Sequence, residues 1–196
     1  MSILFFAETQ KYCEELRNEE LYNTALYDEL THCKNRHALK EFLEENAERW
    51  GNKNTHILLI MFDIDNFKLY NDTFSHPGGD YCLKTIAEAI RKEFPSPSLD
   101  FFRYGGEEFL LFFELNNPKE AAMIMEQVRT AVKNLNIVAP NGAPNQMVTI
   151  SVGGTVIETR SFISFDESLK VVDSYLYQAK NSGKDICVID GELVKE

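Results

Sequence analysis

The segment HILLIMFDID, from His56 to Asp65, places an almost uninterrupted apolar run between two polar stretches. The run has the length of a strand, and a strand without polar alternation is buried on both faces. Other elements must therefore cover it on each side. Helical and strand-like patterns alternate along most of the chain, which predicts an α/β domain with a central β-sheet flanked by helices.

The segment FRYGGEEF, from Phe102 to Phe109, follows a different pattern. Apolar residues flank a Gly-Gly pair closely on both sides, which is typical of two strands joined by a tight turn. Glycine and glutamate are depleted inside strands, so Glu107 and Glu108 are expected at the rim of the turn. A hairpin of this kind makes the predicted sheet mixed.

Amphipathic spacing and breaker residues predict the remaining elements. A helix over residues 8–30 either packs on its own domain or serves as a dimerising or signal-carrying stalk, and the pattern leaves both open. We assign 1–27 to this N-terminal helical extension and 28–196 to the globular domain. Asn117 is expected to cap a helix and Gly183 to end one. The other elements are helices over 35–49, 118–135 and 165–182, a helix after residue 65 that breaks at SHPGGD and resumes over 81–94, and strands over 147–158 and 185–190.

The composition excludes several classes of protein. The formal net charge of the 196 residues is −11, so broad electrostatic capture of a nucleic-acid polymer is not expected. Four scattered cysteines without a CxxC pair argue against a zinc site and favour a reduced, cytoplasmic setting. No apolar run approaches the roughly 20 residues that span a bilayer, so we expect no membrane segment in this chain.

Asp63 stands at the C-terminal end of the apolar strand, where an open α/β sheet holds its ligands. If the hairpin pairs with this strand, Glu107 and Glu108 come close to Asp63. Carboxylates gathered in this way repel one another unless they are protonated or bridged by a cation. Oxygen ligands without Cys or His suit Mg²⁺ or Mn²⁺. The alternative is a solvated acidic rim, but the Gly-Gly turn lets a ligand approach the backbone and favours a site.

Four motifs, taken in order, resemble the GGDEF family, the diguanylate cyclases. RYGGEEF matches the family signature in its GGEEF form. DELTHCKNRHAL, from Asp28, is similar to the family's D-x-L-T-G-L-x-N-R-R-x-F. DIDNFKLYNDTFSHPGGD, from Asp63, is similar to D-x-D-x-F-K-x-x-N-D-x-x-G-H-x-x-G-D, and VDSYLYQAKNSGKD, from Val172, to A-D-x-A-L-Y-x-A-K-x-x-G-R-N. The resemblance covers Asp28 to about Val188 and implies a palm-like nucleotide-cyclase fold.

Domains of this family condense two GTP into cyclic di-GMP and release two pyrophosphates, and the resemblance implies the same reaction here. It assigns two divalent cations, Mg²⁺ or Mn²⁺, to Asp63, the backbone carbonyl of Ile64 and Glu107. Glu107 is also implied in deprotonating the 3′-hydroxyl, and Glu108 in supporting the metal site. The two signature glycines are implied in substrate binding, and they are Gly105 and Gly106.

The resemblance also implies how the base is held. Asn71 and Asp80 fall at guanine-reading positions, where an amide and a carboxylate can match the donors and acceptors of a guanine edge. Taken alone, the two would be an ordinary turn residue and a helix cap. His76 falls at a family position near the base and ribose, although a single histidine is more often structural.

Three lysines are implied in binding phosphate. Lys68 aligns with a lysine that stabilises charge in the transition state, and otherwise it would be an ordinary exposed helix lysine. Lys180 and Lys184 lie one helical turn apart, can share a face, and align with residues that grip the triphosphate. A helix C-terminus favours lysines in any case. Lys184 replaces an arginine, which keeps the charge and loses bidentate geometry.

The chain departs from the family pattern in other places. Ser75 replaces a glycine, and a serine there is strained if its φ is positive. His32 and Cys33 replace a Gly-Leu pair. An R-x-x-D motif that binds inhibitory product in many relatives is missing, because Ser96 and Leu99 stand at its positions. Product feedback is therefore not expected.

An active cyclase is the first hypothesis. Each domain of the family holds one GTP, so a homodimer is implied, and the N-terminal helix is the natural place for a sensor upstream to control it. The alternative is a catalytically weak or inactive domain that binds GTP and regulates a partner. A cyclase of related fold acting on one nucleotide is a third, more remote hypothesis.

Overall fold

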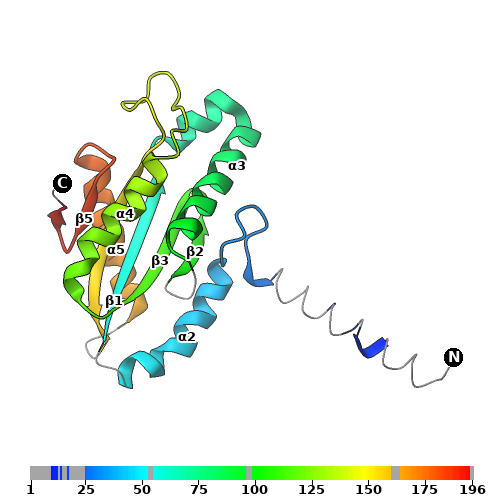
Figure 1. Ribbon diagram of the computed structural model, residues 1–196, viewed down its shortest axis with the longest axis vertical. Helices are drawn as coiled ribbons and strands as arrows, with labels where there is room; N and C mark the ends of the chain where they lie inside the picture. Colours follow the sequence, from blue (N-terminus) through cyan, green and yellow to red (C-terminus); the bar gives the residue numbers. More distant parts are fainter. Residues whose placement is uncertain are drawn as a thin grey trace.

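The computed structural model describes residues 10–12, 14, 17, 25–52, 55–95, 99–159 and 164–194. Over these ranges, six strands form one sheet in the order β2-β3-β1-β4-β5-β6 (Figure 1). Neighbouring strands are antiparallel except β4 and β5, which are parallel, so the predicted mixed sheet is confirmed. The strands are β1 (His56–Ile64), β2 (Asp100–Gly105), β3 (Glu108–Leu115), β4 (Ile150–Glu158), β5 (Cys187–Ile189) and β6 (Glu192–Leu193).

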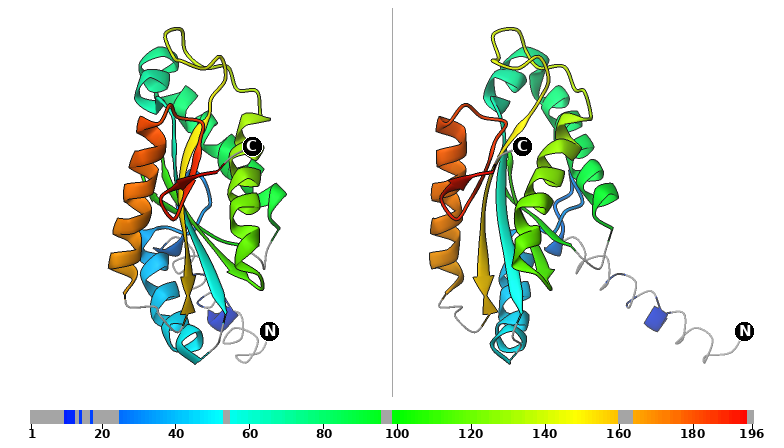
Figure 2. Two further views of the ribbon diagram at one scale, coloured as in Figure 1. Left: turned by 90° about the vertical axis from the view of Figure 1, so that its left-hand side faces the viewer. Right: turned by 60° about the vertical axis from the view of Figure 1, so that its left-hand side comes forward.

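Helices cover both faces of the sheet (Figure 2). One face carries α3 (Phe67–Glu93) and α4 (Ala121–Lys133), and the other carries α2 (Arg36–Asn52) and α5 (Phe165–Asn181). The short helix η1 (Pro118–Glu120) leads into α4. In the described part of the chain, no helix is long and apolar enough to cross a membrane.

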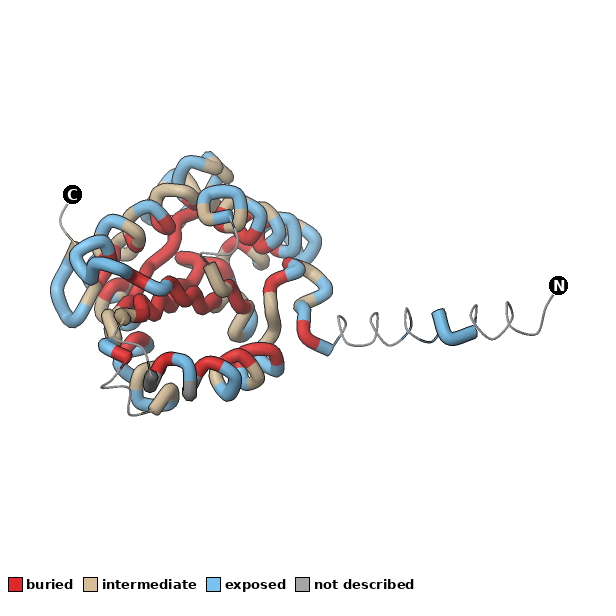
Figure 3. Tube along the Cα trace, turned by 60° about the horizontal axis from the view of Figure 1, so that its bottom comes forward, coloured by how far each residue is buried: buried red, intermediate tan, exposed pale blue. Residues whose placement is uncertain are grey.

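β1 lies between β3 and β4, and every residue from Ile57 to Ile64 is buried. Its side chains alternate between the two faces, as the two-residue period of a strand requires. Figure 3 shows the sheet as a buried layer between outer helices. The prediction of a central strand buried on both faces is confirmed.

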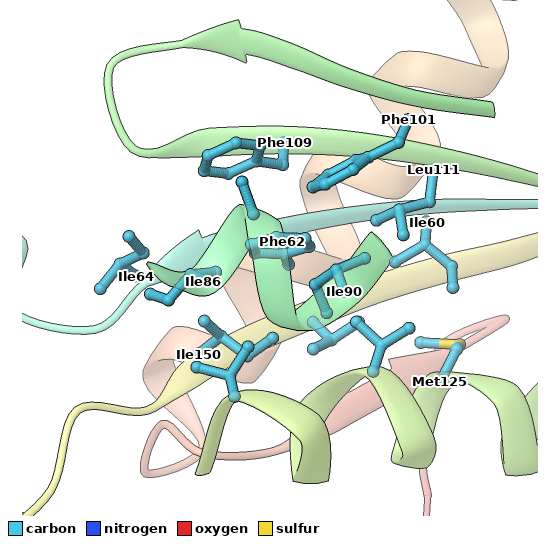
Figure 4. Packing of buried hydrophobic residues seen from close by; sticks show 14 of the residues in the cluster. Ile60, Phe62, Ile64, Ile86, Ile90, Phe101, Phe109, Leu111, Met125 and Ile150 are labelled. Carbon is cyan, nitrogen blue, oxygen red and sulfur yellow. The ribbon is translucent and has the colours of Figure 1, made fainter. Parts of the chain in front are cut away.

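The core on the α3 and α4 face is the larger of the two. Phe62 of β1 stacks on Phe109 of β3 with ring centroids 5.0 Å apart. Ile86 and Ile90 from α3 and Met125 from α4 belong to the same core, and all three side chains are fully buried (Figure 4). Burial of each such side chain contributes about 1.5–3 kcal/mol relative to exposure.

The other face brings α5 unusually close to β4. A Cβ added to Gly153 would lie 2.3 Å from the backbone nitrogen of Leu176, so glycine is needed there for backbone-to-backbone contact. Val172 and Leu176 of α5 pack with Leu59 and Met61 of β1 in the core of this face. This close packing fixes α5, and with it Lys180, against the end of β1.

Most predicted elements are confirmed with shifted ends. The prediction that the N-terminal helix continues to residue 30 is wrong. Tyr27 pairs with Lys34 in an antiparallel bridge, and residues 29–31 form a turn. The turn forms because the Asp28 carboxylate accepts hydrogen bonds from the Thr31 amide and hydroxyl, at 2.8 and 2.6 Å, in competition with helix. Most of residues 8–24 lie outside the described residues. β6 was not predicted.

The predicted break in the helix after β1 is confirmed and lies at Ser75. Two helical halves of α3 meet at this residue, whose φ of 63° and ψ of 172° are not helical. Pro77 follows in the first turn of the second half of α3, where its missing N–H has no helical partner to lose. The left-handed φ at Ser75 is the strain expected from the replacement of a glycine.

We predict that Ser75→Gly stabilises the chain. Removing the side chain relieves strain of about 1–3 kcal/mol, and the extra freedom of glycine in the unfolded state offsets about 0.5–1 kcal/mol of that gain. The free energy of unfolding, measured by urea denaturation, should rise by about 1 kcal/mol. Ser174→Gly, on the exposed face of α5, is the matched control and should lower stability. A loss of stability in both variants would contradict the strain at Ser75.

Candidate active site

Asp63 and the hairpin turn meet at one edge of the sheet. The antiparallel register of β1 and β3 sets Asp63 opposite Glu108, and that of β1 and β4 sets it opposite Ser151. Asp63 is only 7% exposed, whereas Glu107 and Glu108 are half-buried. The hairpin therefore pairs with the apolar strand, as the gathering of these carboxylates required.

A positive charge from α5 reaches this edge. Lys180 Nζ lies 2.8 Å from Asp63 Oδ2. Burial still raises the pKa of Asp63 to about 6, because Lys180 only partly opposes it and Glu107 and Glu108 add repulsion. Burial also raises the pKa of Glu108. The charge of Lys180 lowers this pKa in part, whereas the charges of Asp173 and Glu107 raise it further. Lys180 alone does not balance the negative charge gathered here.

The oxygen atoms at this edge fit a hard divalent cation. Among the described residues, no three His, Cys, Asp or Glu side chains are arranged to hold a metal by themselves. Mg²⁺ does not require such a cage, since it usually takes one or two carboxylates together with waters and substrate phosphates. Asp63, a turn glutamate and the backbone carbonyl of Ile64 supply ligands of that type, and the unbalanced negative charge favours a cation.

Arg103 holds the turn between β2 and β3. Two of its guanidinium nitrogens donate to the Gly106 carbonyl at 3.0 and 2.7 Å, and the third donates to both oxygens of Asp28 at 2.9 and 3.1 Å. Burial disfavours the Asp28 carboxylate, but hydrogen bonds from Thr31 and the charge of Arg103 hold its pKa below the ordinary value. The N-terminal turn and the hairpin turn are thus joined through one guanidinium.

The backbone requires glycine at only one of the two glycine positions of the turn. Gly106 has φ +49°, a conformation that other residues rarely adopt. A Cβ on Gly105 would meet no atom within 4 Å, so nothing in the described chain requires glycine at this position. Both are exposed, and the surface over Gly105 is open to an approaching ligand.

Asp65, two residues beyond Asp63, is buried and organises the chain beneath the site. It accepts hydrogen bonds from the hydroxyls of Thr149 at 2.7 Å and Ser151 at 2.6 Å. The backbone N–H of Asp185 donates to the same carboxylate at 3.1 Å. This carboxylate therefore joins the end of β1 to the start of β4 and to the segment after α5.

Asn71, in the first half of α3, carries a buried Oδ1 that has no hydrogen-bond partner among the described residues. A Cβ on Gly79 would lie 1.8 Å from this oxygen, so the glycine leaves room for the Asn71 amide. The kink at Ser75 brings these two residues together. Asp80 and His76 lie exposed on the second half of α3.

The three lysines occupy different positions relative to this edge. Lys68 is exposed in the first turn of α3. The expectation that Lys180 and Lys184 share a helix face is wrong, because α5 ends at Asn181 and Gly183 turns the chain at φ +123°. Lys184 lies in the turn beyond, with its Nζ 2.5 Å from Asn66 Oδ1.

Comparison with known proteins identifies the family. The profile described as "Diguanylate cyclase, GGDEF domain" matches residues 25–185. The chain belongs to the GGDEF diguanylate cyclase family. It is 33% identical over 167 residues to the probable diguanylate cyclase DgcT of Escherichia coli K12, and 34% identical over 168 residues to the diguanylate cyclase DgcP of Pseudomonas aeruginosa. Each match covers 85% of this chain but only 36% of DgcT and 24% of DgcP.

Solved GGDEF structures share this fold. The coiled coil and GGDEF domain of DgcB from Caulobacter crescentus, in complex with c-di-GMP, superposes with a TM-score of 0.80 at 26% identity, covering 95% of this chain and 97% of that one. The diguanylate cyclase SiaD of Pseudomonas aeruginosa, in complex with its activator SiaC, gives 0.74 at 32% identity and covers 95% and 70%. The predicted GGDEF fold is confirmed.

Two residues that organise this GGDEF domain were missed by sequence reasoning. Asp65 is the second acid of the DID motif, and its position two residues after Asp63 was a usable signal. Arg103 stands in the RYGGEEF signature, but its partner Asp28 lies 75 residues away. No local pattern connects them.

The absence of product feedback remains a prediction. Ser96 lies outside the described residues, and Leu99 packs against the core. Asp100 pairs with Lys34 at 2.8 Å.

We predict that Asp63→Asn stabilises the metal-free domain at neutral pH. Because the pKa of Asp63 in the folded chain, about 6, lies above its ordinary value of 3.8, the folded state holds this proton more tightly. The free energy of unfolding therefore falls as the pH rises from about 4 to 6. Asparagine carries no charge and avoids that loss, so at pH 7.5 with EDTA the free energy of unfolding of the variant should exceed that of the parent by about 3 kcal/mol.

Urea denaturation at two pH values checks this prediction. At pH 4, where Asp63 keeps its proton in the folded chain, the variant and the parent should differ little. An equal difference at both pH values would show that the gain has another cause.

Proposed function

We propose that this domain is a diguanylate cyclase that condenses two GTP into cyclic di-GMP and two pyrophosphates. The observation that carries the proposal is the buried Asp63 at the end of β1, set opposite the Gly-Gly-Glu-Glu turn and short of positive charge. Family membership supports the reaction class. The matched relatives are much longer than this chain, so the activity is proposed for the domain.

Asp63, the carbonyl of Ile64 and Glu107 would hold two Mg²⁺ or Mn²⁺ ions. When bound, these ions supply Lewis acidity and lower the pKa of the attacking 3′-hydroxyl. Glu107 takes up the proton from that hydroxyl, and Glu108 adds negative charge that favours cation binding. The oxygen of one nucleotide attacks the α-phosphorus of another, and pyrophosphate leaves.

Three lysine side chains would bind the phosphates of the nucleotide. Lys180 forms an ion pair with Asp63, and it would be able to turn to phosphate oxygens when Asp63 serves as a metal ligand. Lys184 would bind the triphosphate from the turn after α5, and Lys68 would stabilise charge that develops in the transition state. The open surface over Gly105 gives the nucleotide room to approach the turn.

The base would lie against α3. The buried Oδ1 of Asn71 lacks a partner in the described chain, and an unsatisfied buried acceptor is costly unless a ligand donates to it. A guanine edge can donate to Asn71 and to the Asp80 carboxylate. His76, exposed on the same helix, would lie near the base and ribose.

The reaction joins two nucleotides, and each domain would hold one of them. We therefore propose that two copies of the chain face each other through their turns during catalysis. The segment before residue 28 would connect this domain to a sensor and set whether the two copies meet. Arg103 supports this role, since it ties the Asp28 turn to the catalytic turn.

The first experiment incubates the purified chain with GTP and Mg²⁺ and looks for cyclic di-GMP by mass spectrometry. Glu107→Ala should lower the rate about 100-fold or more, because it removes a metal ligand. Glu88→Ala, an exposed acid on the far part of α3, is the control and should leave the rate unchanged. GTP binding without product at high protein concentration would instead support a regulatory GTP-binding module, and a cyclic mononucleotide would support the one-nucleotide cyclase.

We predict that Asn71→Ala weakens GTP binding without lowering stability. Loss of a hydrogen bond to guanine should raise the Kd for GTP about 10-fold. The free energy of unfolding should not fall, because the buried Oδ1 makes no hydrogen bond with the described chain and removal of an unsatisfied acceptor offsets the packing that is lost.

Asn46→Ala is the matched control for this prediction. Asn46 is equally an α-helical asparagine, but its Nδ2 donates to the Phe42 carbonyl at 2.8 Å. This variant should lose about 1 kcal/mol of stability and keep its affinity for GTP, the opposite of Asn71→Ala. Calorimetric titration with GTP and urea denaturation measure the two quantities. If Asn71→Ala, like Asn46→Ala, lowered the free energy of unfolding and left the affinity for GTP unchanged, Asn71 would be a structural residue.

A further inference from the structure

A buried guanidinium on α4 lies behind the candidate site. The side chain of Arg129 is 7% exposed. Its Nε donates to both oxygens of Glu126 at 3.1 and 3.0 Å, and one terminal nitrogen donates to the Asp185 carboxylate at 2.5 Å and to the Asp185 carbonyl at 3.2 Å. The hydrogen bonds that Arg129 donates to Glu126 and Asp185, together with the negative charges of these two acids, raise the pKa of Arg129, so it stays charged.

Arg129 holds a strained segment of backbone. Gly183, Lys184 and Asp185 have φ values of 123°, 63° and 51° in succession. Left-handed conformations of non-glycine residues cost of order 1–3 kcal/mol each and persist only where the surroundings determine them. Arg129 binds both the side chain and the carbonyl of Asp185, and Lys133 Nζ binds its second carboxylate oxygen at 2.7 Å.

This strained segment contacts the end of β1 at two points. The Asp185 N–H donates to Asp65, and Lys184 Nζ donates to Asn66 Oδ1. Asp65 and Asn66 directly follow Asp63 and Ile64, the residues proposed to bind metal. The position of the Lys184 ammonium group is therefore set by contacts that begin at Arg129.

We propose that Arg129, acting through Asp185, is a positioning residue that fixes Lys184 for the polyphosphate of the nucleotide. Arg129 is too deeply buried to reach a nucleotide itself, so its effect must pass through the residues it holds. The inference rests on the proposed function. It concerns only the β- and γ-phosphate end of the nucleotide and leaves the base contacts of α3 unaffected.

The test compares a ligand that has the polyphosphate with one that lacks it. Arg129→Lys keeps the charge and loses the planar fork. With Mg²⁺ present, this variant should bind 3′-deoxy-GTP, which cannot be condensed, about 10-fold more weakly, and GMP within about 2-fold of the parent. With GTP as substrate, KM should rise by a similar factor while kcat changes less, as expected for a ground-state contact.

A double-mutant cycle identifies the route of the effect. In a Lys184→Ala background, Arg129→Lys should weaken 3′-deoxy-GTP binding by less than about 2-fold, because its effect passes through the missing lysine. Arg91→Lys is the control, since Arg91 is a half-buried arginine on α3 that donates to the Thr31 carbonyl far from this segment. It should leave both affinities unchanged. If Arg129→Lys does not fold, as judged by circular dichroism, Asp185→Asn removes the charge partner and serves in its place.

Three results would overturn the inference. Equal weakening of GMP and 3′-deoxy-GTP would show a general structural effect, and full additivity with Lys184→Ala would show that Lys184 is not the route. Unchanged binding of both ligands would show that Arg129 has no positioning role. If the parent chain bound neither ligand, the proposed function would fail, and the inference would fail with it.

Discussion

The burial of β1 on both faces determines the rest of this fold. A strand whose side chains are apolar on each side needs two helical layers. Leu58 and Leu59 belong to different cores, so alternate residues of β1 pack against alternate layers. The first polar side chain of β1 after His56 is Asp63. The carboxylate therefore lies where the strand leaves the core, held by pairing with a strand on each side.

The edge of the sheet beyond Asp63 gathers acids that would repel one another in isolation. The backbone ladder of β1 and β3 fixes their separation, because Asp63 and Glu108 are register partners. Packing of α5 on Gly153 then places Lys180 within hydrogen-bond distance of Asp63. The fold thus uses core packing to keep in place a charge arrangement that favours binding of cations and phosphates.

The sequence was sufficient to predict elements whose signals are local. The apolar run of β1, the hairpin, the helix cap at Asn117 and the strain at Ser75 each depend on neighbouring residues, and the structure confirms them. The contacts that hold the site are not local. Arg103 with Asp28, Asp65 with Asp185, and Arg129 with Asp185 join residues that are 75, 120 and 56 positions apart. Such pairs depend on the three-dimensional arrangement, and one sequence gives no pattern that connects them. Lys184 was misplaced although a local signal was present, because Gly183 ends α5 and stands between Lys184 and Lys180.

Several of the costs that this chain carries lie at or beside residues proposed to contact the nucleotide. Ser75 and Lys184 have a positive φ, the buried Asn71 Oδ1 has no hydrogen-bond partner among the described residues, and Asp63 is buried with a raised pKa. Three of these costs would be relieved by a single substitution: glycine at Ser75, an apolar side chain at Asn71, or an amide at Asp63. Strain and unsatisfied polar groups of this kind persist where the surrounding structure enforces them and a function depends on them. The kink at Ser75 illustrates the connection, because it returns α3 so that Gly79 lies over the Asn71 amide. A straight helix would separate Asn71 from Gly79 by about two turns, and Gly79 would then no longer lie against the Asn71 oxygen.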